Sequence, residues 1–285
     1  MFLFSKLAAI GMRPSEISEV REFMSRDYLS DVHRLNILLN NRGNAGLQEV
    51  PPIPFTGDID SMERGNCIFL IGINPHFPAL SRDAHINEID PIKQLIQRFH
   101  EGNETSYLEF IKSRLSYFQG SMANWVHYDG IGAGYAENFF PNQSQRSVWR
   151  KNVFAADILP YWSTDTGKIS LSKLGKNIDK DPALILHQKM LSKLIEEIQP
   201  SMVHINGISA GRLVNKLYCN EDPLKPWGML GEEHNLMFGK ASFGNFKVPV
   251  MTHNQFGQWG PKKRHWPEFA AAWSDWRSSQ QGTKQ

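Results

Sequence analysis

The chain has 285 residues, of which 41% are hydrophobic and 21% are charged, as in an ordinary globular protein. Its formal net charge of +2 neither indicates nor excludes a nucleic-acid partner, and its two cysteines exclude a disulfide framework and any four-cysteine metal site. No apolar run approaches the roughly 18 residues that a membrane span needs. The apolar start of the chain is a poor signal peptide, so we expect a cytoplasmic protein with no membrane contact.

Strand and helix patterns alternate along the chain. Residues 14–39 carry apolar side chains at helical spacing, and a turn-rich stretch follows. Continuous apolar runs then predict strands buried on both faces, as in a parallel sheet. These runs are residues 67–71, 153–159, 202–205 and 248–251.

Helices are predicted between and after these strands. Asp181 followed by Pro182 is a capped helix start, and Pro200 ends that helix. The other predicted helices are residues 90–100, 107–118, 209–217 and 267–277. Residues 235–247 predict a β-hairpin. The glycine-rich residues 129–135 lack the third glycine of a dinucleotide fingerprint and are interpreted as a flexible loop.

This alternation predicts an α/β fold, a three-layer α/β/α sandwich with a mainly parallel central sheet. We expect one domain over residues 1–285. It would carry a helical N-terminal extension (1–50), a large insertion (82–150) and a frayed tail (278–285). The eight tryptophans and 17 phenylalanines are expected to pack in the interior more than to stack on a ligand.

Polar residues occur at or just after the end of each predicted strand. They are Asn74, Asp157, Asn206 and His253. In open α/β sheets, ligands bind beyond the carboxyl ends of the strands. An amide, a carboxylate and an imidazole are therefore predicted to meet at one edge of the sheet.

Four elements, in this order, resemble motifs of the uracil-DNA glycosylase superfamily, most closely its single-strand-selective and mismatch-specific branches. Residues 72–75 read Gly-Ile-Asn-Pro, and residues 157–160 read Asp-Ile-Leu-Pro where the single-strand-selective branch has Asn-x-x-Pro. Residues 207–210 match Gly-x-x-Ala, and residues 253–255 stand where the family has a His-Pro-Ser-like loop. The resemblance covers about residues 66–276, and it implies a uracil-DNA-glycosylase-like fold.

The resemblance implies an enzyme that flips a base out of DNA and hydrolyses its N-glycosidic bond. No HExxH or EF-hand pattern is present, so we expect no metal and no cofactor. No lysine stands at a matched catalytic position, which implies a monofunctional glycosylase. Three departures are present: the last loop lacks Pro-Ser, His76 replaces a glycine, and Asp157 replaces the asparagine that reads the base. The two cysteines also exclude the iron–sulfur branches.

By this resemblance, Asn74 would hold the attacking water and His253 would donate a hydrogen bond to the base as negative charge develops. Phe77 would stack on the base. The alternatives are that Asn74 only turns the chain, that His253 caps a strand end and that Phe77 packs in the core. The residues expected to bind the base are Gly72, Ile73, Pro75, His76, Phe77 and Asp157.

The residue type at position 157 bears on whether the substrate is uracil or a modified cytosine. An ionised aspartate only accepts hydrogen bonds, and it would repel uracil O4 unless protonated, whereas acidic residues pair with the cytosine amino group. Uracil is the substrate by resemblance, and a modified cytosine is the substrate by this residue. A hydroxymethylated or glucosylated cytosine of phage DNA would suit an anti-phage defence enzyme. The alternative is that Asp157 caps a helix or pairs with Arg150.

The loop after His253 carries the predicted DNA contacts. Gln255, Phe256 and Trp259 would enter the DNA where the base leaves. The basic residues Lys262, Lys263 and Arg264 would contact phosphates, unless they are simply a solvated surface. The expected partner is DNA, duplex or single-stranded, and the protein is expected to be a monomer. The rival functions are a non-catalytic nucleic-acid-binding module and a nucleoside hydrolase that would not need the basic cluster.

Overall fold

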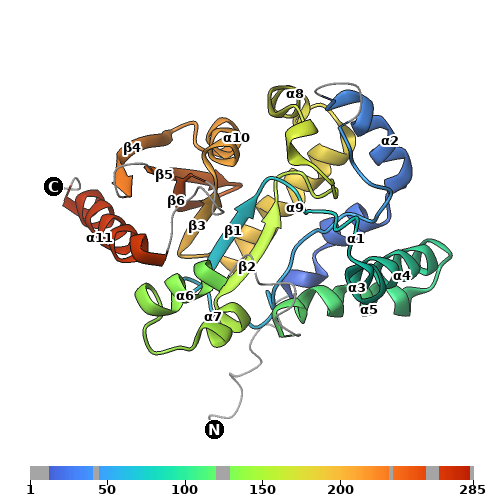
Figure 1. The fold of residues 1–285 in the computed structure, drawn as a ribbon, viewed down its shortest axis with the longest axis horizontal. Helices are drawn as coiled ribbons and strands as arrows, with labels where there is room; N and C mark the ends of the chain where they lie inside the picture. Colours follow the sequence, from blue (N-terminus) through green and yellow to red (C-terminus); the bar gives the residue numbers. More distant parts are fainter. Residues whose placement is uncertain (1–12, 41–44, 120–128, 231–233, 255–262, 283–285) are drawn as a thin grey trace, which may run out of the picture.

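The computed structural model describes residues 13–40, 45–119, 129–230, 234–254 and 263–282. It forms an α/β protein in which a six-stranded mixed sheet is flanked by helices (Figure 1). The strand order in the sheet is β2-β1-β3-β6-β5-β4. The strands are β1 (Ile68–Gly72), β2 (Val153–Asp157), β3 (Met202–Asn206), β4 (Asp222–Leu230), β5 (His234–Phe243) and β6 (Phe246–His253).

The four apolar runs that predict buried strands are confirmed as β1, β2, β3 and β6, which run parallel to one another. Their side chains alternate between two core clusters, so both faces of the sheet are covered. The register pairs Gly72 with Asp157 and Asn206 with His253. The carboxyl ends of the four strands therefore lie along one edge.

The hairpin predicted over residues 235–247 is also confirmed, because β5 and β6 are antiparallel with Phe243 opposite Phe246. The sequence does not predict β4, since Pro223, Pro226 and Gly228 are typical of turns. β4 tolerates them because it lies at the edge of the sheet. Its pairing with β5 is shifted in register near these residues.

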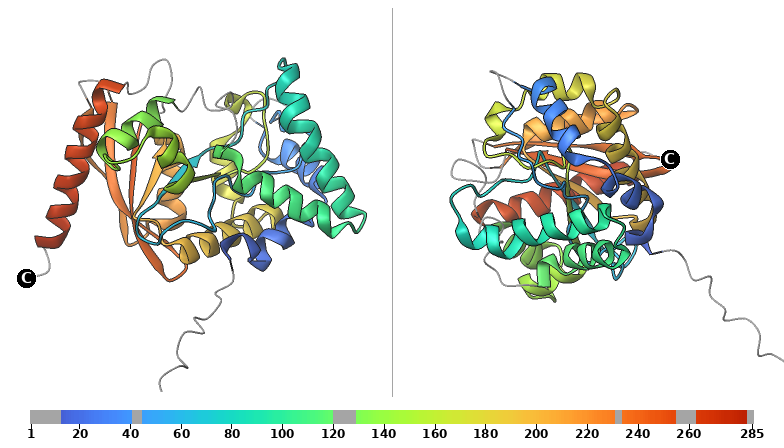
Figure 2. Two further views of the ribbon diagram at one scale, coloured as in Figure 1. Left: turned by 90° about the horizontal axis from the view of Figure 1, so that it is seen from below. Right: turned by 90° about the vertical axis from the view of Figure 1, so that its right-hand side faces the viewer.

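Helices lie on both sides of the sheet, with α10 on one side and α11 on the other (Figure 2). The helices before β1, the pair α4 and α5, and α8 to α10 contribute to one core cluster, whereas α6, α7 and α11 contribute to the second. The helices are η1 (Pro14–Glu16), α1 (Ser18–Met24), α2 (Tyr28–Leu38), α3 (Arg82–Ala84), η2 (His85–Ile89), α4 (Asp90–His100), α5 (Glu104–Leu115), η3 (Tyr117–Gln119), α6 (Asp129–Asn138), α7 (Gln145–Lys151), η6 (Thr166–Lys168), α8 (Leu171–Asn177), α9 (Pro182–Ile198), α10 (Ile208–Tyr218), η7 (Lys263–His265) and α11 (Trp266–Gly282).

Local signals explain where several helices begin and end. The Asp181 side chain accepts hydrogen bonds from the backbone N–H groups of Ala183 and Leu184, so α9 begins as predicted. It ends at Gln199, which has a φ of 50°, just before Pro200. The helical pattern over residues 14–39 is divided into α1 and α2, because Asp27 caps a new helix.

The interpretation of residues 129–135 as a flexible loop is wrong, because they form the first part of α6. Gly132 and Gly134 weaken helix propensity, which explains the error. In the structure they allow two tryptophans to pack closely against the helix. A Cβ on Gly132 would lie 2.0 Å from the Trp149 side chain, and a Cβ on Gly134 would lie 1.9 Å from Trp266.

Part of the segment expected to form a frayed tail is helical. Residues 278–282 continue α11 instead of fraying. This helix is held by Trp266, Trp273 and Trp276, which are buried in the second cluster and show that these aromatic side chains pack in the interior. Within the described ranges, no helix combines the length and the apolar character that crossing a membrane requires.

Candidate functional site

The edge where the parallel strands end carries the predicted polar residues. Asp157 ends β2, Asn206 ends β3 and His253 ends β6, so the expectation that they share one edge is confirmed. Because side chains alternate along a strand, Asp157, His204 and His253 lie on the face covered by α6, α7 and α11. Strands are about 4.8 Å apart, and three such steps separate Asp157 from His253 by about 14 Å.

The Asp157 carboxyl lies over β1, where Gly72 leaves room for it. A Cβ added to Gly72 would come within 2.2 Å of Asp157 Oδ1, so a side chain there would displace the carboxyl. The backbone carbonyl of Asp157 accepts a hydrogen bond from Nε2 of His187 at 2.8 Å, which holds the end of β2 against α9. The position of Asp157 is therefore fixed by two contacts: Gly72 leaves space for its side chain, and His187 holds its backbone.

Within the described residues, the carboxylate of Asp157 has neither a hydrogen-bond partner nor an ion pair. It does not cap a helix, and Arg150 donates to the carbonyl of Gln119 at 3.4 Å instead. Burial without a partner raises the pKa of Asp157 from 3.8 to about 7, because the ionised form loses hydration and gains nothing in return. Both protonation states are therefore populated near neutral pH. Such shifted groups in a sheet-edge site are typical of functional residues.

Asn74, in the segment after β1, is held by the segment that follows β2. Its Nδ2 donates to Ser163 Oγ at 2.7 Å and to the carbonyl of Pro75 at 3.0 Å. Its Oδ1 accepts a hydrogen bond from Thr166 Oγ1 at 3.0 Å. A carbonyl oxygen has two lone pairs, so Oδ1 keeps the capacity to accept a second hydrogen bond. The amide is fixed in orientation and half-buried.

His253 belongs to a buried chain of hydrogen bonds. Its Nδ1 faces the backbone carbonyl of Asn254, and its Nε2 lies 2.7 Å from Nε2 of His204. The other ring nitrogen of His204, Nδ1, faces the hydroxyl of Tyr135. A carbonyl only accepts, so His253 Nδ1–H donates to Asn254, His204 Nε2–H donates to His253, and Tyr135 O–H donates to His204.

Burial favours the neutral forms of His204 and Tyr135. It lowers the pKa of His204 well below its ordinary value and raises that of Tyr135. His253 is fully buried, and the proton order above leaves no ring N–H pointing at the sheet edge. A hydrogen bond from His253 to a base would require the ring to leave His204, so its role stays a prediction.

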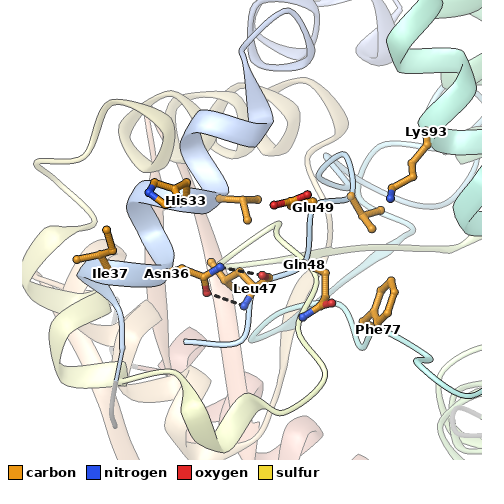
Figure 3. Close-up of a pocket in the computed structure, with 10 residues that line it drawn as sticks. His33, Asn36, Ile37, Leu47, Gln48, Glu49, Phe77 and Lys93 are labelled. Carbon is orange, nitrogen blue, oxygen red and sulfur yellow. Dashed lines mark hydrogen bonds between the residues drawn. The ribbon is translucent and has the colours of Figure 1, made fainter. Parts of the chain in front are cut away.

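A cavity of about 430 Å³ opens beside Phe77 (Figure 3). Phe77 is the one predicted base-binding residue in its lining, and its ring points toward the cavity across from α2. Lys93 reaches the cavity from α4, within the predicted insertion. The remaining polar side chains in the wall are His33, Asn36, Gln48 and Glu49.

The other predicted residues are spread around the edge. Ile73 and Pro75 are half-buried and His76 is exposed. Lys263 begins η7, and Arg264 is exposed with its Nε donating to His265 Nε2 at 3.1 Å. Four predicted DNA-binding residues lie outside the described residues: Gln255, Phe256, Trp259 and Lys262.

Sequence reasoning missed four residues of this site: Ser163 and Thr166, which hold Asn74, and Tyr135 and His204, which hold His253. A histidine inside an apolar strand run was an available signal for His204, since a buried imidazole needs partners. The sequence gives no signal for Tyr135, because the glycine-rich residues before it favour a loop and not the helix α6.

The described part of the chain contains no group of His, Cys, Asp or Glu side chains that could hold a metal ion. No known protein-family model matches the chain, and no curated protein matches it in sequence.

Proposed function

We propose that this chain is a monofunctional DNA base glycosylase that hydrolyses the N-glycosidic bond of an extruded pyrimidine. One observation carries the proposal: the unpartnered carboxyl of Asp157 lies over Gly72 at the edge where the parallel strands end, and the fixed amide of Asn74 follows the neighbouring strand. Ligands of open α/β sheets bind at this edge. The three-layer, uracil-DNA-glycosylase-like arrangement that we infer from the sequence motifs has its site at the same place.

Asn74 would position the attacking water. Its Oδ1 can accept one more hydrogen bond beside the one from Thr166, and Ser163 prevents the amide from turning. In the reaction, the bond between the sugar carbon and the base nitrogen breaks and its electron pair leaves with the base. Water then bonds to the sugar carbon and releases a proton to solvent. A positively charged sugar needs a placed water more than a strong base.

A modified cytosine is the substrate that the site favours over uracil, because Asp157 can accept from the cytosine amino group in either protonation state. The cavity at Phe77 has the size of a small-molecule pocket and a polar wall, which suits a hydroxyl-rich substituent such as glucose. Lys93, on α4 of the predicted insertion (82–150), is part of this wall. Such a substrate would suit a defence role against phages whose DNA carries modified cytosine.

DNA would be held near the start of α11. Arg264 is exposed there, and Lys262 and Lys263 precede it in sequence. Contacts to phosphates would make binding salt-dependent. We propose that the protein acts as a cytoplasmic monomer.

The testing experiment measures base release by mass spectrometry from duplex and single-stranded DNA. The DNA carries uracil, cytosine, hydroxymethylcytosine or glucosylated hydroxymethylcytosine. Release of a modified cytosine, lost in Asn74→Ala and kept in the exposed control Asn220→Ala, is the expected result. Uracil release alone would make the enzyme a repair glycosylase and contradict the substrate assignment.

The burial of His253 favours a second candidate, a non-catalytic nucleic-acid-binding module. A glycosylase of the resembled branches needs this histidine at the base, and here both of its ring nitrogens are engaged within the protein. Salt-dependent DNA binding without release of any tested base would support the module. Release of bases from free nucleosides, unaffected by neutralising Arg264, would instead indicate a nucleoside hydrolase.

A further inference from the structure

We infer that Asp157 is the general acid of the reaction and that its proton moves to N3 of an extruded cytosine derivative as the base leaves. This inference rests on the proposed function. It assigns to Asp157 a proton transfer in addition to recognition of the base.

The surroundings of Asp157 differ from those of the other buried aspartates. Asp31 accepts hydrogen bonds from Arg26 and Arg34, each at 2.7 Å, and Asp181 accepts from Arg34 at 2.7 Å. Burial opposes the ionisation of Asp31, but the two arginines outweigh it and lower its pKa. Asp157 has no such cation or donor among the described residues. The fold therefore pairs two aspartates with arginines and leaves the third without a cation among the described residues.

The geometry leaves the carboxyl of Asp157 accessible to a ligand. Its Oδ1 occupies the space in front of Gly72, at the strand ends, and the residue is partly exposed to solvent. The backbone bond from His187 fixes the strand end without using either carboxyl oxygen. Neither carboxyl oxygen is used by a donor among the described residues, so both remain able to form hydrogen bonds with a ligand.

A carboxylic acid presents one O–H donor and one carbonyl acceptor side by side. The pairing edge of cytosine presents the complement, an N3 lone pair beside an amino donor. The acid can therefore form two hydrogen bonds with cytosine and pass its proton along one of them. Uracil carries a hydrogen on N3 and has no lone pair there to receive the proton, so only a cytosine derivative can accept the proton at N3.

The bond between the sugar carbon and N1 breaks, and its electron pair moves onto the base. The O–H bond of Asp157 breaks, and its proton forms the new N3–H bond, so the base departs neutral. Water adds to the sugar carbon and gives up a proton to solvent, and Asp157, left as a carboxylate, regains a proton from solvent.

The pKa of about 7 agrees with this role, because an acid is most effective when its pKa is near the working pH. Burial lowers the pKa of His187 to about 4, so this neighbour stays neutral above that pH and does not produce a step near 7. None of the charged or titratable side chains on described elements packed against β2 forms an ion pair with Asp157. These side chains include Asp58, in the segment that pairs with Ala155, the α7 residues Arg146, Arg150 and Lys151, and the α9 residue His187, which bonds to the Asp157 carbonyl.

The test is the pH dependence of kcat and KM between pH 5 and 9 for release of the modified cytosine that the wild type accepts. We expect kcat to fall tenfold for each pH unit above about 7. In Asp157→Asn, kcat should fall by about 10²- to 10⁴-fold and lose this dependence. KM should change much less, because an amide still pairs with cytosine but has no acidic proton. Asp179→Asn, at an exposed position, is the matched control.

The outcomes separate this inference from the proposed function. A wild-type enzyme that releases a modified cytosine with a flat profile across pH 7, or an Asp157→Asn variant that keeps its kcat, overturns the general acid alone. Failure of the wild type to release any base overturns the proposed function and the inference together. The wild-type profile needs no variant, so the test holds even where Asp157→Asn folds poorly.

Discussion

Replacing Asp157 by asparagine is expected to stabilise the protein at alkaline pH. The pKa of this carboxyl is about 7 in the folded protein and 3.8 without burial. Between these values the folded state binds one proton more than the unfolded state, so the free energy of unfolding falls as the pH rises. Asparagine does not titrate, and it removes this dependence.

The size of the effect follows from the two pKa values. They lie about 3 apart, and each step of one corresponds to about 1.4 kcal/mol, so the complete loss is about 4 kcal/mol. About 2.5 kcal/mol of that loss is expected between pH 5 and pH 8, because the carboxyl of the unfolded chain is already mostly ionised at pH 5. Above pH 8 the loss is nearly complete, and the curve should level off.

Urea unfolding at pH 5, 6, 7 and 8 measures this effect as the difference in unfolding free energy between Asp157→Asn and the wild type. The difference cancels the histidines, which titrate equally in both proteins. We expect it to rise with pH by about 2.5 kcal/mol across this range in favour of the variant. The exposed Asp179→Asn should show no trend. A difference that stays constant from pH 5 to pH 8 would refute the argument that Asp157 is desolvated and unpartnered.

Three further outcomes follow from the site. Tyr135→Phe removes the donor to His204 and leaves a buried nitrogen without its partner, so urea unfolding should show a loss of about 1–3 kcal/mol. An unchanged midpoint would show that the hydroxyl does not hold the imidazole. Gly72→Ala introduces a Cβ 2.2 Å from Asp157 Oδ1, so base release should be lost while the melting temperature changes little. Lys93→Ala should lower kcat/KM for glucosylated hydroxymethylcytosine severalfold and leave the unglucosylated base unaffected. Equal effects on both bases would argue against a sugar in this cavity.

The sequence predicts the elements whose signals are local and mutually consistent. The apolar runs of β1 and β3 are buried on both faces, and Asp181 with Pro182 marks the start of α9. It does not predict α6 or β4, because the glycines and prolines in these elements are explained by contacts between distant parts of the chain and not by local propensity. Gly134 makes room for Trp266, and Pro226 is tolerated at a sheet edge, and neither contact is visible before the fold is known.

The same distinction applies to the site. The position of Asp157 at the sheet edge follows from strand order and a general rule of α/β folds. Its protonation does not, because that depends on which donors are absent around it in space. Likewise, the end of β6 indicates His253, but only the structure reveals that His204 occupies its Nε2.

Asp157 combines a stability cost with the chemical capacity that we propose for it, and on that proposal the two together would explain why an aspartate stands there. The resembled enzymes have a neutral asparagine at the corresponding position, and an asparagine here would avoid the loss of about 4 kcal/mol above pH 7. Groups that destabilise a fold are found where function requires them. An amide can read a base but cannot protonate it. If Asp157→Asn is both more stable at pH 8 and unable to release a modified cytosine, the same proton accounts for both results.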